Sequence, residues 1–169
     1  PTPAVLEAFL SDETNRAYEK LVEQLMQHTA FGERLASMWL NISRYAEDQA
    51  HQVGANTAFF YPNAYKYRAW IINAFNNDLP YDDFIRKQLA ADLQENKTVV
   101  DLPALGFIGL GHKYYDRNRL AVKAEEWSEQ VDTLTRAFLG LTVACAQCHD
   151  HKYDPVTQKD YYALAGVFA

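Results

Sequence analysis

Two cysteines and one histidine near the C-terminal end of the chain have the spacing of a haem-attachment segment. Cys145 and Cys148 are separated by two residues, His149 follows at once, and the chain has no other cysteine. C-x-x-C-H is the attachment signal of a c-type haem. Two intervening residues place both sulfurs along one edge of a porphyrin, where each sulfur can form a thioether to a vinyl-derived carbon. The next imidazole then faces the iron as the proximal axial ligand. These residues, 145–149, are called the CxxCH segment below, and they predict one covalent haem c per chain.

Two other interpretations of the same side chains fit the sequence less well. A structural zinc site would draw on both cysteines, His149 and His151, but His149 adjoins Cys148 and His151 is only two residues further on. That spacing is poor for tetrahedral chelation. A thioredoxin-like dithiol would follow a strand in a βαβ unit, and the sequence has no such pattern.

Composition and charge narrow the class of protein. The 169 residues suffice for one domain with a sizeable core, and aromatic residues make up 14% of the chain. The net charge of −6 argues against nucleic-acid binding, which needs a basic surface. The longest apolar run, residues 138–146, is too short for a membrane span. The expected partner is a redox protein or a neighbouring domain of the same polypeptide.

Covalent haem attachment takes place outside the cytoplasm, so this interpretation requires an exported protein, periplasmic or otherwise extracytoplasmic. The chain carries no signal peptide, and residues 166–169 stop within an apolar helical pattern. We therefore expect residues 1–169 to be a single mono-haem domain excised from a longer multidomain protein.

Apolar residues recur at helical spacing along most of the chain and no period-2 strand stands out, so the sequence predicts an all-α fold. The haem is expected near the C-terminal end of a single helical domain. Thr2 before Pro3, and Thr157 with Asp160 three residues on, have the chemistry of helix starts. Residues 105–111, with three glycines, are expected as a tightly packed helix or a strand. The expected helices cover residues 3–10, 14–28, 35–46, 62–75, 80–93, 119–142 and 161–169.

The helical periodicity also predicts which residues are buried. On the helix across 35–46 the expected buried face includes Met38, Trp39 and Ile42, and on the helix from 80 it includes Leu89 and Leu93. The other expected core residues are Tyr67, Trp70, Ile71, Ala74 and Phe75, then Trp127, Val131, Leu134, Phe138 and Leu141.

Several stretches of the chain resemble a known family. The most specific is C-A-Q-C-H-D-H-K-Y-D-P at residues 145–155. The chain is similar there, and over nearly its whole length, to the planctomycete cytochrome-associated family named domain of unknown function 1549. The resemblance implies a segment of a large exported protein, between an N-terminal planctomycete cytochrome c domain and a second domain of unknown function. It supports haem attachment and localisation, and supplies no reaction. The other similar stretches are residues 32–34, 39–46, 62–68, 79–85 and 160–166.

The second axial ligand has several candidates. We rank His51 first because it lies at a loop just past an amphipathic helix, and an open or water-bound site second. Met38 and His112 follow, although a methionine on an apolar face is more often core filler.

Residues just after the CxxCH segment are expected beside the porphyrin. His151 is too close to His149 in the chain to reach the far face of the iron. Its expected roles are a hydrogen bond to a haem propionate or fixing of the loop. Lys152 and Tyr153 are the leading propionate donors, because the attachment segment holds them near the porphyrin.

Three functions remain open from the sequence. The first is a mono-haem electron-transfer module with a six-coordinate iron. The second is a haem enzyme or sensor that acts on peroxide or a diatomic gas at an open distal side. The third is a non-haem adaptor domain in which the two cysteines form a disulfide. The sequence favours the electron-transfer module over a catalyst.

Overall fold

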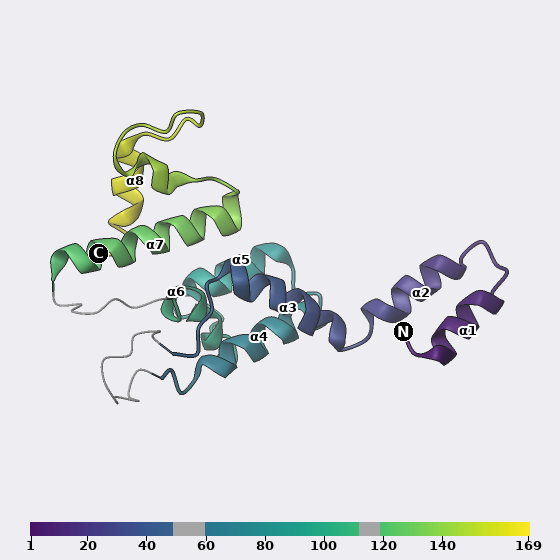
Figure 1. The fold of residues 1–169 in the computed structure, drawn as a ribbon. Helices are drawn as coiled ribbons and strands as arrows, with labels where there is room; N and C mark the ends of the chain where they lie inside the picture. The colour runs from purple at the N-terminus through teal and green to yellow at the C-terminus, as the bar shows by residue number, and fades with distance from the viewer. Residues whose placement is uncertain (49–59, 112–118) are drawn as a thin grey trace.

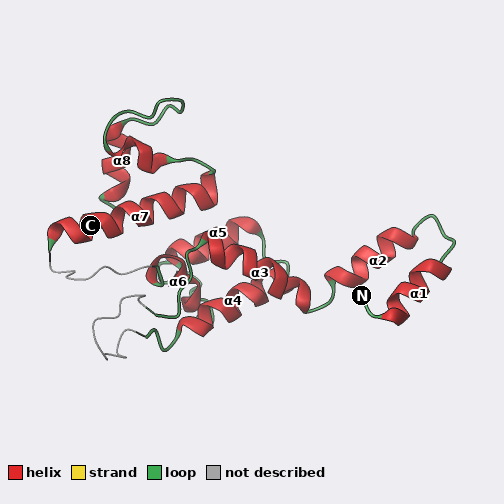
Figure 2. Ribbon diagram, in the orientation of Figure 1, coloured by secondary structure: helices red, strands yellow, loops and turns green. Residues whose placement is uncertain are grey.

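The protein is described by a computed structural model that covers residues 1–48, 60–111 and 119–169. Within these ranges every regular element is a helix, and the only β-type pairing is an isolated antiparallel bridge between Asp48 and Phe60. Figure 2 shows the same helical architecture by colour. The predicted all-α fold is confirmed. The elements form three groups along the chain (Figure 1).

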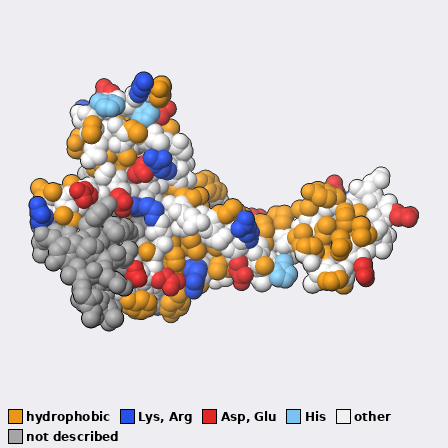
Figure 3. Space-filling model, viewed as in Figure 1, with side chains coloured by type: hydrophobic (Ala, Val, Ile, Leu, Met, Phe, Trp, Pro, Cys, Tyr) orange, Lys and Arg blue, Asp and Glu red, His pale blue; other side chains and the backbone are white. Residues whose placement is uncertain are grey.

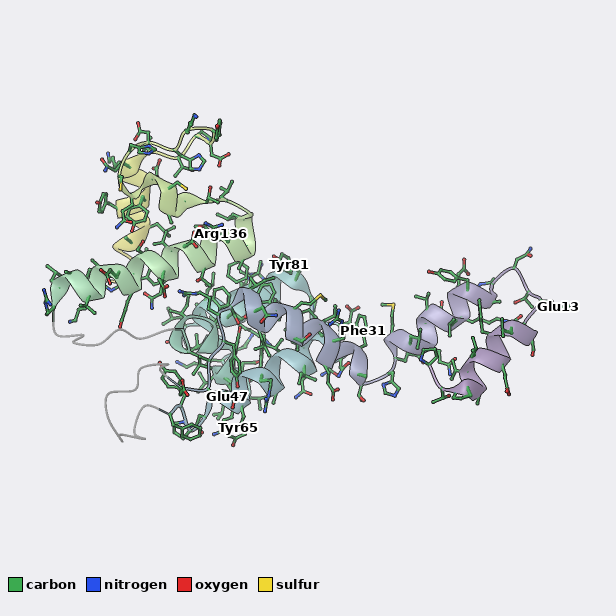
Figure 4. The ribbon with its side chains drawn as sticks, in the orientation of Figure 1. Glu13, Phe31, Glu47, Tyr65, Tyr81 and Arg136 are labelled. Carbon is green, nitrogen blue, oxygen red and sulfur yellow. The ribbon has the colours of Figure 1, made fainter. Side chains whose placement is uncertain are left out.

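The first group is a helical hairpin that projects from the rest of the molecule (Figure 1). It consists of α1 (Pro3–Ser11) and α2 (Ala17–Met26). Thr2 caps α1, since its side-chain oxygen accepts a hydrogen bond from the Val5 N–H at 3.4 Å, as the sequence predicted. Neither helix contains a fully buried residue. Figure 4 marks the turn of the hairpin by Glu13 and the start of the next helix by Phe31.

The second group contains the main hydrophobic core. Its buried residues come from α3, α4, α5, η1 and α6, and include the predicted α4 face of Tyr67, Trp70, Ile71 and Ala74. Aromatic rings dominate it, and the Trp39 and Phe84 centroids are 4.9 Å apart in an edge-to-face contact. The elements are α3 (Ala30–Ile42), α4 (Ala64–Asn76), α5 (Tyr81–Ala90), the 3₁₀ helix η1 (Leu102–Leu105) and α6 (Gly106–Gly109).

The glycine-rich stretch forms the 3₁₀ turn and short helix η1–α6, not a strand. A Cβ added at Gly106 would lie 2.6 Å from the Tyr67 ring, so glycine allows α6 to pack directly on α4. The close approach at Gly106 is therefore to a neighbouring helix.

The predicted buried faces of α3 and α5 were partly wrong. Met38 and Ile42 are 45% and 47% exposed, and Leu93, which lies past the end of α5, is 80% exposed. On α3 the small residues Gly32 and Ala36 are buried instead, together with Trp39, because α3 packs closely along α4. Leu89 is also exposed, at 39%.

The buried α5 position next to Leu89 is the polar Gln88, which is fully inaccessible to solvent. Its Oε1 accepts hydrogen bonds from Trp39 Nε1 at 2.9 Å and from the Tyr67 hydroxyl at 2.8 Å. Its Nε2 donates to the Phe84 carbonyl. A buried amide whose groups are hydrogen-bonded carries little desolvation penalty. This explains how Gln88, and not the neighbouring Leu89, can occupy the core position on α5.

The third group holds the C-terminal end of the chain. It is built from α7 (Leu120–Leu139), the 3₁₀ helix η2 (Val143–Gln147) and α8 (Gln158–Ala165), around a second cluster of buried side chains. Gly140 ends α7 in the left-handed conformation, with φ 66°. α7 joins the two cores, because Phe138 contacts Phe107 with ring centroids 4.8 Å apart.

Candidate functional site

The CxxCH segment begins inside the 3₁₀ helix η2. A 3₁₀ helix has three residues per turn, so side chains three positions apart lie on the same side. Val143 and Ala146 form the inner side and are buried against α7 and α8. Cys145 and Cys148 are also three apart, Cys148 continues the helical backbone as the C-cap, and both are exposed free thiols. The local fold therefore presents the two sulfurs together on the outer side.

The hydrogen bonding of His149 fixes its tautomer. Its ring Nδ1 lies 2.7 Å from the backbone carbonyl oxygen of Asp150. A carbonyl oxygen only accepts hydrogen bonds, so Nδ1 carries the proton and Nε2 keeps its lone pair in the neutral ring. His149 is exposed, and its Nε2 is the ring nitrogen that can ligate a metal.

His151 holds the opposite tautomer and fixes the loop. Its Nδ1 accepts hydrogen bonds from the backbone N–H groups of Tyr153 and Asp154, at 3.2 and 2.9 Å. Nδ1 is therefore unprotonated, so the 3.3 Å approach of the Asp154 carboxylate is not an ion pair in this state. Nε2 lies 2.9 Å from Thr142 Oγ1 and donates to it. Both nitrogens of this largely buried ring are thus used in holding the loop after His149.

The N-terminal end of α8 anchors the CxxCH segment from the other side. The Asp150 carboxylate accepts a hydrogen bond from the Gln158 N–H at 2.8 Å, at the positive end of the helix. The Gln147 carbonyl accepts from Gln158 Nε2 at 2.9 Å and from the Tyr162 hydroxyl at 3.3 Å. Neither Gln158 nor Tyr162 was predicted as part of the site.

The helix that supplies these anchors begins with the predicted capping box. Thr157 Oγ1 accepts from the Asp160 N–H, and the Asp160 carboxylate accepts from the Thr157 N–H at 2.8 Å. The Thr157 side-chain and backbone hydrogen bonds lower the pKa of Asp160 below its ordinary value. This Thr-x-x-Asp pattern was the one sequence signal for a helix positioned against the site.

Lys152 and Tyr153 lie at the outer end of the loop between η2 and α8. The Lys152 Nζ lies 5.1 Å from the centroid of the Tyr153 ring, in a cation–π contact, and Tyr153 is 82% exposed. Figure 3 shows histidine, basic and acidic side chains gathered at this end of the molecule.

The structure separates the candidates for the second axial ligand from the CxxCH segment or leaves them undescribed. Met38 lies on α3, in the second group of helices, whereas η2 packs with α7 and α8. His51 and His112 fall outside the described residues.

The arrangement offers two thiols and one imidazole nitrogen from a single short segment. In the described part of the chain, no group of three or more histidine, cysteine, aspartate or glutamate side chains is arranged to hold a metal ion. No helix within the described residues has both the length and the apolar character of a membrane span.

One comparison with known proteins finds a match. A family model described as Protein of unknown function (DUF1549) matches residues 1–169, the whole chain. Neither the curated proteins nor the solved structures contain a match to this chain.

Proposed function

The chain belongs to the DUF1549 family, and we propose that it is a mono-haem c-type cytochrome domain that carries one electron at a time. Its redox partner is a separate protein or a neighbouring domain of the same polypeptide. The setting that this proposal requires is periplasmic or otherwise extracytoplasmic, where haem is attached covalently.

One observation carries the proposal, namely that η2 and the two residues after it present three reactive groups together. Cys145 and Cys148 share the outer side of the 3₁₀ turn, and both are free thiols. His149 follows with Nδ1 bound to the Asp150 carbonyl and Nε2 available. The donor set and its geometry fit a haem attached at one edge and ligated by the adjacent imidazole.

The roles of these residues follow from their chemistry. Cys145 and Cys148 would hold the group through two thioethers. Each would form by addition of S–H across a vinyl group, in which the S–H bond and the vinyl π bond break and a C–S and a C–H bond form. His149 would hold the iron through Nε2, and its Nδ1–H···O=C bond orients the ring for this role. Haem c, when bound, supplies an iron that accepts and releases one electron.

The exposure of the CxxCH segment supports electron exchange with a partner protein. Cys145, Cys148 and His149 are all exposed, so a group held by them has an edge that another protein can approach. Exposure to water also favours the more highly charged oxidised iron, which lowers the reduction potential.

A second candidate function rests on the same geometry. Two free thiols three residues apart on one side of a turn are also suited to an internal disulfide, as in a non-haem adaptor domain of an oxidising compartment. Its formation would need an oxidant and would leave the protein colourless.

The deciding experiment is intact-mass spectrometry and absorption spectroscopy of the chain matured in a periplasm that attaches haem. The proposal predicts a mass increase of one haem and haem absorption bands that survive denaturation. Loss of two hydrogen atoms without colour would establish the disulfide instead. A six-coordinate low-spin spectrum would favour electron transfer, and a five-coordinate spectrum would favour the haem enzyme or sensor.

A further inference from the structure

A cavity lies between the N-terminal end of α4, η1 and α6. Its volume is about 570 Å³, within the range of small-molecule sites. No residue of the CxxCH segment lines it, so it is separate from the site described above. Tyr65, labelled in Figure 4, marks the end of α4 that borders it.

The walls of the cavity are mostly apolar. Val99 and Leu102 line it and are 82% and 40% exposed. Large apolar side chains that remain exposed to water around a cavity often mark a ligand-binding site. The other apolar lining residues are Pro62, Ala64, Pro103, Leu105 and Leu110.

Two glycines of α6 behave differently toward this space. Gly106 is packed against the Tyr67 ring, as described above, and forms part of the cavity wall. Gly109 lies one turn further along, lines the cavity, and would place a Cβ with nothing within 4 Å. The helical backbone at Gly109 would accept a larger side chain without strain, so the volume of the cavity can be changed there.

The one charge among the described residues that line the cavity is positive. Lys66 is the only charged residue among the described residues that line it, and it forms no ion pair with another described residue. It stands in the first turn of α4, where the helix dipole is also positive and the Asn63 side chain makes no capping hydrogen bond. A cation and a helix start without a side-chain cap thus lie beside the apolar walls of the cavity. This arrangement complements a ligand that has an anionic head and an apolar body.

We propose that this cavity binds a small anionic amphiphile, a carboxylate with an aliphatic or aromatic body. The body lies along Leu102, Leu105 and Gly109, and the carboxylate lies at Lys66. The site does not depend on haem attachment, and its test reads a different property of the chain.

Isothermal titration of the haem-matured chain with octanoate and with 1-octanol tests the proposal. One octanoate binds per chain, and 1-octanol binds about fivefold more weakly because it lacks the charge. In Lys66→Gln the preference for octanoate falls to about twofold or less, the remainder being due to the helix start. Gly109→Phe fills the cavity and weakens octanoate binding by about tenfold or more, whereas the matched control Gly109→Ala stays within about twofold of the parent.

Amide hydrogen exchange locates the ligand independently of any variant. Octanoate should protect amides within residues 62–66 and 102–110. Protection of the α1–α2 hairpin instead, equal affinity for 1-octanol and octanoate in the parent chain, or absence of binding would each overturn the proposal. Because the chain can be tested with or without haem, failure here is distinct from failure of the cytochrome assignment.

Discussion

His149 and His151 lie two residues apart and hold opposite tautomers, which assigns them different roles. The hydrogen bond from His149 to the Asp150 carbonyl requires the ring proton to be on Nδ1, so Nε2 is available to ligate a metal. His151 is protonated on Nε2 and uses both ring nitrogens within the protein. The sequence predicted a ligand role for His149 and either a propionate contact or fixing of the loop for His151. It could not predict the tautomers, because they depend on how the loop folds back.

Replacement of His149 tests its proposed role as the proximal ligand. His149→Ala should lose the low-spin absorption spectrum expected of the parent, because the iron lacks its proximal ligand. This holds whether the variant attaches haem through both cysteines as well as the parent does or with a lower yield. The measurement is the absorption spectrum of the reduced protein matured in the same host. His28→Ala, another exposed histidine at the start of α3, is the matched control and should keep the parent spectrum. An unchanged spectrum in His149→Ala would remove it as the axial ligand.

Replacement of the loop histidine tests the second role. His151→Ala leaves the Tyr153 and Asp154 N–H groups without their acceptor and should lower the free energy of unfolding by about 1–3 kcal/mol. Urea unfolding of the haem-free chain measures this. His149→Ala is the control, and should change the stability by no more than about 0.5 kcal/mol, since its side chain is exposed. Equal effects of the two substitutions would contradict the role of His151 in holding the loop.

At the scale of helices, local chemistry was the best guide from sequence to structure. Thr2 and Thr157 cap α1 and α8 as their side chains and following residues predicted. The α4 face was predicted because its large apolar residues recur at helical spacing and are covered by several neighbouring elements at once. Met38 was mispredicted as buried and the burial of Gln88 was not predicted, since burial at these positions depends on which partner the helix meets and not on hydropathy. The anchors of the CxxCH segment on α8 were missed because their contacts are set by tertiary packing.

The cap of α8 can be tested against the equivalent cap of α1. Thr157→Ala should lower stability by about 1 kcal/mol and speed amide exchange at Gln158 and in η2, since α8 anchors the Gln147 carbonyl. Thr2→Ala removes a similar cap from the projecting hairpin and should leave exchange in η2 unchanged. Equal exchange in η2 for both variants would show that α8 does not support the site.

The buried hydroxyl of Tyr67, which joins α4 to Gln88 of α5, makes the stability of the fold decrease at alkaline pH. Burial raises the pKa of Tyr67 from 10.0 to about 12, against smaller lowering by its hydrogen bonds with Ser43 and Trp39. The native phenol thus stays protonated after the unfolded one ionises, so the stabilisation is complete below pH 10 and is lost as pH rises toward 12. The loss should reach about 2–3 kcal/mol. Tyr67→Phe should flatten this part of the pH–stability curve, and Tyr18→Phe, at a position 71% exposed, should not. The same slope in both variants would contradict the assignment.

At the scale of the whole molecule, the CxxCH segment is carried by a C-terminal group with its own buried cluster. α7 joins that group to the main core through Phe138, while the α1–α2 hairpin projects away from both (Figure 1). The site is thus held from two sides by contacts with α7 and α8 and is open on its outer side. That combination suits a cofactor that must be fixed to the chain and reached by a partner.

The most direct test of the account is the intact mass of the chain after maturation in a haem-attaching periplasm, compared with the Cys145→Ala/Cys148→Ala double variant. We expect the parent chain to gain the mass of one haem, retained after denaturation, and the double variant to keep the mass of its polypeptide. A parent chain that shows only its polypeptide mass under these conditions would contradict the cytochrome assignment.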